Sequence, residues 1–528
     1  MKVLFVWPHK DSFGFKSIGI SLLSAIAKRR GWETKLFDTT LFDLGYVDAK
    51  NFGESVKLFK PVDLSSYDMS KKKIDLDYEF KSVLTIFKPD CVAMSVLSEE
   101  ISIAEQLSNT AKEMYCDIPI IWGGKYATLM PEKLLAFNSI DFVCISEGLE
   151  SFSEFLDAME NKKDLYNIDN IWGKKNGRFI RNSVRQLKDN LDDLPYVDWS
   201  IFDRRQFYKV FDGKVYRSGD HMLNWGCPYH CTYCINDFYH RLYDNKYNMR
   251  RFSVNRIIKE LKFLKKTYSL EFFKFHDEDF LMRPLENLRK LSKAYKEEVG
   301  LPFVIETNPK SVVEEKVRIL KDMNCVSASI AIESGNPKVR KELLGRVDNE
   351  EDICRAFELM KRYGIRSSSF ILFAIPRETR QTYEDTIALC RKANVHYVDI
   401  GFFFPFEGTK LRNIAIEEGF YDLNDKKRQV FRWDLPALKF KNLSDDDLIA
   451  MREVFVLYVK LPVCYELYIR RSETQDQLGT LLRKKIISIY DKTVYENDCW
   501  FVDDGNEQRY LEELAAICQD YKSEIKKF

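Results

Sequence analysis

Two runs of short apolar strands alternating with helices constrain the fold of this chain more than any other feature of its sequence. In the first run, apolar segments with the length of buried strands fall at 2–7, 33–37, 90–96, 118–122 and 141–145, and helical periodicity separates them, as at 17–30. This alternation predicts an α/β domain over residues 1–160, built on a doubly wound parallel sheet. Ligands of such sheets bind at the carboxyl ends of the strands.

The second run begins near residue 221. A strand there ends in a cysteine-rich loop, a helix follows at 253–267, and further strands fall at 271–275, 302–306, 327–333, 367–374 and 397–404. Six strand–helix units predict a partial (β/α)6 barrel over 221–412, with its chemistry at the carboxyl ends of the strands. Residues 161–220 lack a periodic face and indicate a connector, with hairpin turns at Asn176-Gly177 and Asp212-Gly213. Residues 413–528 predict a mainly helical C-terminal domain, which could cap the barrel mouth or stand apart.

Composition excludes several classes of protein. Lys and Arg (82) nearly balance Asp and Glu (81), so we expect neither nucleic acid nor an anionic membrane as a partner. No run reaches the roughly 20 apolar residues of a membrane span, and the first residues read as a buried strand. Nine of the twelve cysteines are scattered singly, which does not resemble a disulfide framework and indicates a reducing cytoplasm.

Three of the cysteines are clustered. Cys227, Cys231 and Cys234 lie in the stretch NWGCPYHCTYCIND. Three thiolates can hold three corners of a cubane iron–sulfur cluster and leave the fourth iron open to a small molecule. The alternative is a tetrahedral zinc site completed by His230 or His240. The six strand–helix units favour iron–sulfur, because a zinc knuckle does not require them.

This loop, placed after a strand and before a (β/α) alternation, resembles the radical S-adenosylmethionine (radical SAM) enzymes. Three further motifs extend the resemblance in order: SIAIESGNPKVRKELLGR at 329–346, FAIPRET at 373–379 and PFEGTKL at 405–411. The resemblance implies a [4Fe-4S] cluster whose open iron binds SAM, and an external electron donor such as flavodoxin or ferredoxin. Once reduced, such a cluster splits SAM to give a 5′-deoxyadenosyl radical.

The resemblance also names residues that would contact SAM. These are Glu333 and Ser334 after the fourth strand, Pro376 in the FAIPRET stretch, and Glu278 in HDEDF, where Asp277 is an alternative. Each has a simpler interpretation: Glu333 could be a surface carboxylate, Pro376 a turn residue, and HDEDF a solvated acidic turn. Ala374 replaces the family's usual Gly, and Asn224-Trp225 replaces the Arg common before GCP.

The first domain, with a Rossmann-like alternation, resembles that of the cobalamin-binding radical SAM class. The segments GGKYATLMPEKL, SEGLESFSEF and DDLPYVDWSIFD carry this resemblance. It implies that Gly123, Gly124, Glu147 and Gly148 lie at the cobalamin edge. The alternatives are a plain tight turn at the glycine pair and a domain that has lost its cobalamin. The motif D-x-H-x-x-G is absent, since none of the six histidines follows an Asp by two residues, but this class generally binds cobalamin without a His ligand.

The resemblance predicts a cobalamin-dependent radical SAM enzyme that methylates an unactivated carbon of a small-molecule, lipid or peptide substrate. One SAM would methylate cobalt, and a second would yield the radical that takes a hydrogen atom from the substrate. One alternative is a cobalamin-dependent radical rearrangement or cyclisation without methyl transfer. The alternative from another class is a zinc-stabilised binding module without catalysis.

Overall fold

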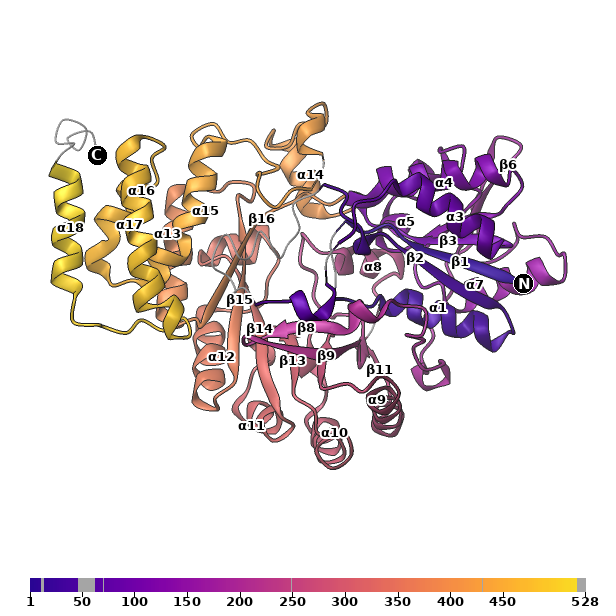
Figure 1. The fold of residues 1–528 in the computed structure, drawn as a ribbon, viewed down its shortest axis with the longest axis horizontal. Coiled ribbons are helices and arrows are strands. Elements are labelled where there is room, and N and C mark those ends of the chain that lie inside the picture. Colours follow the sequence, from indigo (N-terminus) through magenta and orange to yellow (C-terminus); the bar gives the residue numbers. More distant parts are fainter. Residues whose placement is uncertain (11–13, 46–61, 70, 248, 430, 520–528) are drawn as a thin grey trace.

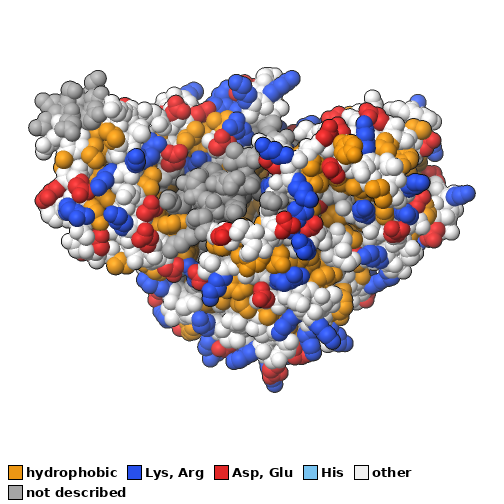
Figure 2. Space-filling model, in the orientation of Figure 1, with side chains coloured by type: hydrophobic (Ala, Val, Ile, Leu, Met, Phe, Trp, Pro, Cys, Tyr) orange, Lys and Arg blue, Asp and Glu red, His pale blue; other side chains and the backbone are white. Residues whose placement is uncertain are grey.

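The computed structural model describes residues 1–10, 14–45, 62–69, 71–247, 249–429 and 431–519. Over these residues the chain forms two seven-stranded sheets and a two-stranded ribbon, and the sheets lie in different halves of the molecule (Figure 1). None of the helices described there is both long and apolar enough to cross a bilayer. Basic and acidic side chains are intermingled over the face shown in Figure 2, as the balanced composition leads one to expect.

The first sheet has the strand order β2-β1-β3-β4-β5-β6-β7. Its first five strands are parallel and its last two antiparallel. The strands are β1 (Lys2–Trp7), β2 (Glu33–Asp38), β3 (Cys91–Ser95), β4 (Ile120–Gly123), β5 (Phe142–Cys144), β6 (Ile171–Lys175) and β7 (Arg178–Ile180). The helices are α1 (Ile18–Arg29), α3 (Leu76–Phe87), α4 (Ile101–Met114), α5 (Lys125–Leu129), α6 (Pro131–Leu135) and α7 (Leu149–Glu160).

Side-chain alternation along β1 explains the two helical layers. Val3 and Phe5 belong to the apolar core formed with α1 and α7, whereas Leu4 and Val6 belong to the core formed with α3 and α4. Because successive residues of a strand point to opposite faces, an unbroken apolar strand needs cover on both sides. The predicted doubly wound sheet is therefore confirmed.

The second sheet has the order β16-β15-β14-β13-β12-β9-β8, with six parallel strands and an antiparallel β8 at the edge. It curls with its helices on the outer face, as the predicted partial barrel requires (Figure 1). The strands are β8 (Tyr208–Phe211), β9 (Lys214–His221), β12 (Phe272–Phe275), β13 (Phe303–Thr307), β14 (Cys325–Glu333), β15 (Arg366–Phe373) and β16 (Tyr397–Phe402). The helices are α8 (Ile235–Leu242), α9 (Val254–Tyr268), α10 (Leu285–Glu298), α11 (Glu314–Asp322), α12 (Glu350–Arg362), α13 (Arg380–Lys392) and α14 (Lys410–Glu417).

Both predicted hairpins form. Asn176-Gly177 joins β6 to β7, and Asp212-Gly213 joins β8 to β9, with all four residues in the left-handed region, as two-residue hairpin turns require. Residues 161–220 therefore add strands to both sheets and are more regular than the expected connector. The boundaries of the four predicted regions stay a prediction.

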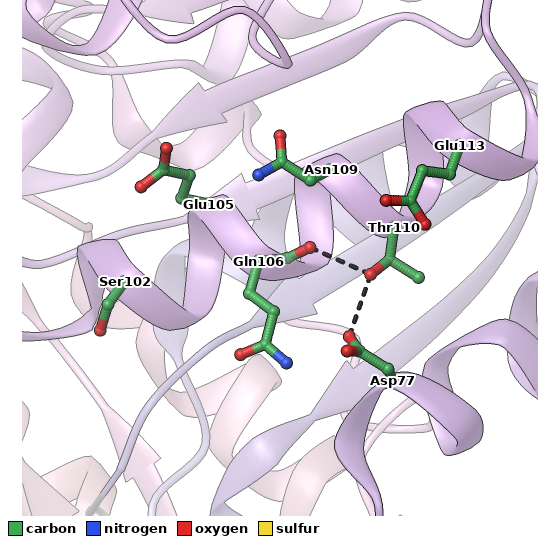
Figure 3. Close-up of a pocket in the computed structure, with 7 residues that line it drawn as sticks. All are labelled: Asp77, Ser102, Glu105, Gln106, Asn109, Thr110 and Glu113. Atoms are coloured by element: carbon green, nitrogen blue, oxygen red, sulfur yellow. Dashed lines mark hydrogen bonds between the residues drawn. The ribbon is translucent and has the colours of Figure 1, made fainter.

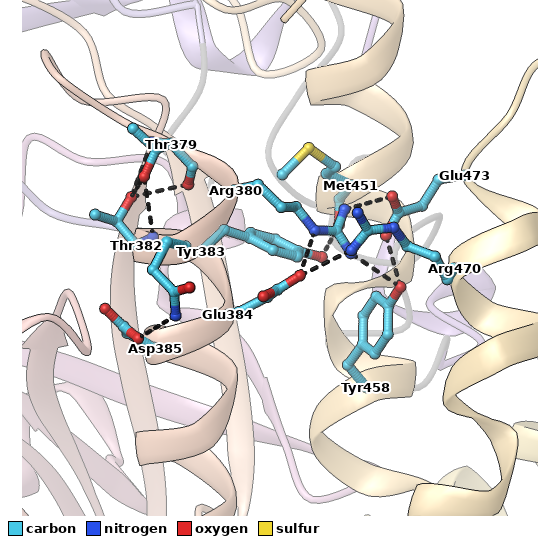
Figure 4. Close-up of polar contacts among 11 residues, drawn as sticks. Thr379, Arg380, Thr382, Tyr383, Glu384, Asp385, Met451, Tyr458, Arg470 and Glu473 are labelled. Carbon is cyan, nitrogen blue, oxygen red and sulfur yellow. Dashed lines mark hydrogen bonds and ion pairs between the residues drawn. The ribbon is translucent and has the colours of Figure 1, made fainter. Parts of the chain in front are cut away.

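The C-terminal helices are α15 (Asp445–Lys460), α16 (Glu466–Ser472), α17 (Gln477–Thr493) and α18 (Glu507–Gln519). Helix α15 packs against α13 and β16, and α16 and α17 pack against α15, so α15 covers the outer side of the barrel's last strand and the other helices extend away from it (Figure 1). Polar contacts centred on Arg380 fasten them there (Figure 4). Its guanidinium donates to Glu473 at 2.5 Å, to Glu384 at 2.8 Å and to the Tyr458 hydroxyl at 3.2 Å.

Candidate active site at the facing strand ends

The cysteine loop follows β9 at the carboxyl end of the barrel. Cys227 is buried, Cys231 and Cys234 are half-buried, and helix α8 begins directly after Cys234. The N-terminus of a helix carries partial positive charge, which favours a thiolate at Cys234. The Asn236 amide also donates to the Cys234 sulfur at 3.5 Å. Both interactions favour anionic sulfur at Cys234.

The three thiols lie close enough together for Cys231 and Cys234 to act on the pKa of Cys227. Burial raises the pKa of all three thiols, and that of Cys227 is raised further by its two companions. Even so, among the described residues no three His, Cys, Asp or Glu side chains stand close enough to hold one metal ion. In a cubane each thiolate binds a different iron, so the sulfurs need not converge on one point. His240 Nε2 donates to the Cys227 carbonyl at 2.8 Å, which removes one candidate zinc ligand.

Glu333 lies beside this loop. It ends β14 with a φ of 63°, and its buried carboxylate accepts a hydrogen bond of 3.0 Å from the Tyr233 hydroxyl, which belongs to the loop itself. Arg346 stands 3.8 Å from the same carboxylate and donates to the Tyr233 hydroxyl at 3.1 Å. Ser334 is buried, and its hydroxyl accepts from the Asn336 backbone N–H at 3.3 Å. The fold therefore brings the fourth strand end to the cysteines.

The acidic residues of HDEDF separate into two groups. Asp277 accepts the backbone N–H groups of Leu223 and Asn224, at 3.0 and 2.7 Å, and so fixes the chain that leads into the cysteine loop. Asp279 is likewise buried and bonded to protein hydroxyls. Glu278 is exposed, and its charge adds to the rise that burial causes in the pKa of the Cys227 and Cys234 thiols. Of the two predicted alternatives, Glu278 is the one with a free carboxylate near the sulfurs.

Pro376 is buried in the turn after β15. Ala374 in the same turn has a φ of 55°, which explains why glycine is usual at this position of the motif. Pro376 carries no polar side-chain atom, and its rigid ring shapes the turn. At the position of the missing Arg, Asn224 accepts a 2.7 Å hydrogen bond from Arg283, a buried residue that no sequence motif singled out.

The predicted cobalamin residues lie at the carboxyl ends of β4 and β5. Gly124 has a φ of 97°, and a Cβ there would stand 2.9 Å from the Val96 carbonyl oxygen. Gly123 would accommodate a Cβ in ordinary contact, and a Cβ on Gly148 would lie 3.3 Å from the Cys144 sulfur. Glu147 pairs with Arg250 on β11 (Arg250–Arg251). Its carboxylate thus joins the first sheet to the chain after the cysteine loop.

Further contacts make the strand ends of the two sheets face each other. Tyr126 of α5 donates to Glu407, which lies in the PFEGTKL segment, and Lys133 reaches the same carboxylate at 3.0 Å. Ser146 bonds to the Tyr243 hydroxyl, directly after α8. Accordingly α5 and α8 lie close together near the centre of Figure 1. A ligand bound at one edge would approach a ligand bound at the other.

Two domain families match the chain, each over the segment in which the sequence motifs predicted it. Residues 225–390 match the radical SAM superfamily, and residues 74–156 match the B12 binding domain. The chain therefore combines the two domains of the cobalamin-binding radical SAM class, as its motifs predicted. It is an enzyme whose cofactors are a [4Fe-4S] cluster, SAM and cobalamin, as predicted, and the non-catalytic zinc module is not supported.

Relatives and solved structures agree with this assignment. The chain is 24% identical to an uncharacterised methyltransferase, PH0819, of Pyrococcus horikoshii over 73% of this chain and 82% of the relative. It is 21% identical to an anaerobic magnesium-protoporphyrin IX monomethyl ester cyclase of Rubrivivax gelatinosus, over 81% of this chain and 70% of the relative. It shares the fold of the radical SAM methyltransferase TsrM from Kitasatospora setae, with a TM-score of 0.64, 14% identity, and coverage of 93% of this chain and 99% of that one.

A surface hollow of this radical SAM enzyme lies away from the facing edges. It measures about 330 Å³ and is lined by residues of α3 and α4, among them Asp77, Glu105 and Glu113 (Figure 3). The Thr110 hydroxyl donates to Asp77 at 3.0 Å across it. None of its lining residues is among those that the sequence motifs single out for the cluster, SAM or cobalamin.

Proposed function

We propose that this radical SAM enzyme methylates an unactivated carbon of a small polar molecule. The observation that carries the proposal is the pairing of the two strand-end edges through Tyr126–Glu407 and Ser146–Tyr243. A radical made at one edge and a methyl group carried at the other must meet on one substrate, and these contacts keep the edges together. The P. horikoshii relative is described as a methyltransferase, which supports the same reaction class.

The roles of the residues follow from their places. Cys227, Cys231 and Cys234 would hold the cluster, Glu278, Glu333 and Ser334 would bind the polar groups of SAM, and Pro376 would shape the wall beside it. Gly123, Gly124 and Gly148 would let backbone approach cobalamin closely, while Glu147 would hold the two edges together through Arg250. When bound, the cofactors supply a hydrogen-abstracting radical and a transferable methyl group. The chain's own work is to orient the substrate between them and to exclude water.

The inner face of the barrel supports a polar substrate. Val398 and Phe402 of β16 face the helical core, so Asp399 between them points to the opposite, inner side. On the same side, Lys274 of β12 pairs with Glu306 of β13 at 3.3 Å. Burial raises the pKa of Asp399 to about 6 despite the nearby Lys274. These charges suit a small polar molecule better than a lipid chain, and TsrM has been solved with tryptophan as its substrate.

The predicted alternative, rearrangement or cyclisation, also has a supporting observation. The R. gelatinosus relative is described as a cyclase and covers more of this chain than PH0819 does. The same residues would generate the substrate radical in both reactions. The reactions differ in whether a methyl group is transferred.

Isotope-labelled SAM separates the two reactions. The enzyme, reconstituted anaerobically with iron, sulfide and cobalamin and reduced by flavodoxin, would be given SAM with a trideuterated methyl group and a panel of amino acids and nucleotides. Methylation predicts a product that carries the label, with S-adenosylhomocysteine and 5′-deoxyadenosine released in equal amounts. A product without label, formed with 5′-deoxyadenosine alone, would establish the alternative reaction.

We also propose that the enzyme works in the cytoplasm with flavodoxin or ferredoxin as its electron donor. None of the twelve cysteines forms a disulfide, including the exposed Cys116 and Cys464. Exposed thiols persist in a reducing compartment, which is also where a low-potential electron donor is available.

A further inference from the structure

Two sulfurs of the cysteine loop accept hydrogen bonds from backbone N–H groups. That of Tyr229 donates to Cys227 and that of Asn236 to Cys234, and each bond opposes the rise that burial causes in the pKa of its thiol. Cys234 has a further donor, the side-chain amide of Asn236, whose nitrogen lies 3.5 Å from the sulfur. The backbone donors come with the path of the loop, whereas this amide comes with the choice of one side chain. It is therefore the donor whose effect a single substitution can isolate.

Asn236 is a buried polar residue inside a helix. It lies in the first turn of α8 and is 3% exposed. Asparagine is a weak helix former, and burying an amide costs free energy unless its groups are hydrogen-bonded. Its side chain bonds to the Cys234 sulfur through the amide nitrogen and to the Tyr247 hydroxyl, 3.3 Å away, through Oδ1. These contacts, and not helix propensity, account for asparagine at this position.

Tyr247 fixes the direction in which the Asn236 amide points. The Tyr247 hydroxyl donates to Asn236 Oδ1, which leaves the amide nitrogen for the sulfur. A thiolate accepts hydrogen bonds and has none to donate, so the opposite orientation would turn the amide oxygen toward another acceptor. Tyr247 is itself buried, and in such surroundings a hydrogen bond is electrostatically stronger than in water. Asn236 and Tyr247 therefore act together on Cys234.

Stacked rings hold Tyr247 in place. The ring of Tyr239 lies 5.2 Å from it between centroids, with an interplanar angle of 20°, and that of Tyr243 lies 6.2 Å from it at 16°. Tyr239 is hydrogen-bonded in turn to Thr128, and Tyr243 to Ser146, both in the first domain. The contact between the two domains thus fixes the hydroxyl that orients the amide.

We propose that Asn236 and Tyr247 are positioning residues that raise the reduction potential of the [4Fe-4S] cluster through Cys234. One electron from a donor of the flavodoxin or ferredoxin class takes the cluster from its 2+ to its 1+ state and adds negative charge, part of which falls on the coordinating sulfurs. A hydrogen bond to such a sulfur stabilises the more negative state, and these bonds are among the features that set the potential. The inference concerns the cluster, so it holds whichever reaction the substrate radical undergoes.

A redox titration followed by electron paramagnetic resonance measures the effect. The whole chain, reconstituted with iron and sulfide, would be titrated with dithionite and redox mediators, and the signal of the 1+ cluster gives the midpoint potential. Asn236→Leu removes the amide and keeps a branched side chain, so we expect a lower midpoint potential. Tyr247→Phe keeps the ring and releases the amide, and its potential should fall less. Tyr239→Phe is the matched control and should keep the wild-type potential, because its hydroxyl bonds to Thr128 and not to the amide.

A second measurement tests the contact itself. With asparagine labelled by 15N in its side-chain amide, a nitrogen bonded to the cluster gives a weak hyperfine coupling in pulsed electron paramagnetic resonance, which should be present in the wild type and absent in Asn236→Leu. An equal midpoint potential in these two proteins, or no coupling in the wild type, would overturn the proposal. If Asn236→Leu does not retain iron, Tyr247→Phe decides, and a potential equal to that of Tyr239→Phe overturns it. Neither measurement involves substrate or methyl transfer, so failure here is distinguishable from failure of the proposed function.

Discussion

Ala374 occupies a left-handed backbone conformation (φ 55°) that costs a residue with a Cβ about 1–2 kcal/mol. Ala374→Gly removes that conformational cost from the folded state. Part of the gain in stability is offset, because glycine also gives the unfolded chain more conformational entropy. We expect the variant to be more stable by about 0.5–1 kcal/mol in urea unfolding. Ala356→Gly, in the middle of helix α12, is the control and should be destabilised by about 1 kcal/mol. If both variants lose stability alike, the left-handed turn contributes nothing.

The paired glycines after β4 give a second prediction. Gly124→Ala forces a Cβ to 2.9 Å from the Val96 carbonyl oxygen in an unfavourable conformation, so we expect a loss of about 1–3 kcal/mol in unfolding free energy. Gly123→Ala meets atoms no closer than 3.9 Å and should change stability by less than about 0.5 kcal/mol. Its cobalamin affinity should nevertheless fall if backbone at Gly123 touches the cofactor. Titration of both variants with cobalamin measures this affinity. An unchanged affinity in Gly123→Ala would show that the backbone at Gly123 does not contact the cofactor.

Glu278 and Asp277 are adjacent carboxylates with different surroundings. Glu278→Gln removes an exposed charge beside the cysteines, and loss of a charge-assisted hydrogen bond of about 1.5–3 kcal/mol should weaken SAM binding about tenfold or more. Its stability should be unchanged. Asp277→Asn should leave SAM binding unchanged. It should lower the unfolding free energy by about 1–3 kcal/mol, because the carboxylate accepts hydrogen bonds from two buried backbone N–H groups. Calorimetric titration with SAM and urea unfolding of both variants decide between these roles.

At the scale of elements, the contacts drawn in Figure 4 bind α16 and α15 to α13. Glu473, 13% exposed, pairs with Arg380 and accepts from the Tyr458 hydroxyl at 2.7 Å. Glu473→Gln should therefore cost about 1–2 kcal/mol and speed hydrogen exchange in α16. The control Glu358→Gln removes an exposed pair with Arg362 on α12 and should cost less than about 0.5 kcal/mol. Equal exchange in α16 of both variants would refute a docking role for Arg380.

The elements were predictable to the extent that their signals are local. Apolar runs located β1 and β3 to within a residue or two, and the turn residues Asn176-Gly177 and Asp212-Gly213 located both hairpins. The sheet to which each hairpin belongs depends on distant partners, so residues 161–220 looked like a connector. Motif spacing singled out the three cysteines and Glu333, and the structure brings Glu333 to the cysteine loop. Spacing could not tell the exposed Glu278 from the buried Asp277, because that distinction depends on how the folded chain buries each side chain.

At the scale of the whole molecule, a buried charge cluster joins the two sheets. Asp220 of β9 pairs with Lys16, which precedes α1, at 2.9 Å and with Lys209 of β8 at 2.7 Å, and His276 Nε2 donates to it at 2.9 Å. Burial alone would raise the pKa of Asp220, but Lys16 and Lys209 outweigh it and hold the pKa well below the ordinary value. Lys16 also lies over the Phe207 ring. The cluster thus fastens the segment before α1 to the first strands of the barrel.

Asp220→Asn should therefore loosen the molecule as a whole. It leaves the buried Lys16 ammonium and the half-buried Lys209 ammonium without their anion, and breaking a buried pair costs about 3–5 kcal/mol. Because the folded-state pKa of Asp220 is depressed, its stabilisation is present above the unfolded pKa of about 3.9 and is lost as pH falls toward the folded value. The stability gap between wild type and variant should be constant from about pH 5 to 8 and close only below about pH 4. Lys16→Met combined with Asp220→Asn should recover part of the loss, since it removes one unpaired cation. Urea unfolding at several pH values measures this difference in stability. If the difference already narrows between pH 7 and 5, a histidine and not Asp220 controls the stability of the charge cluster.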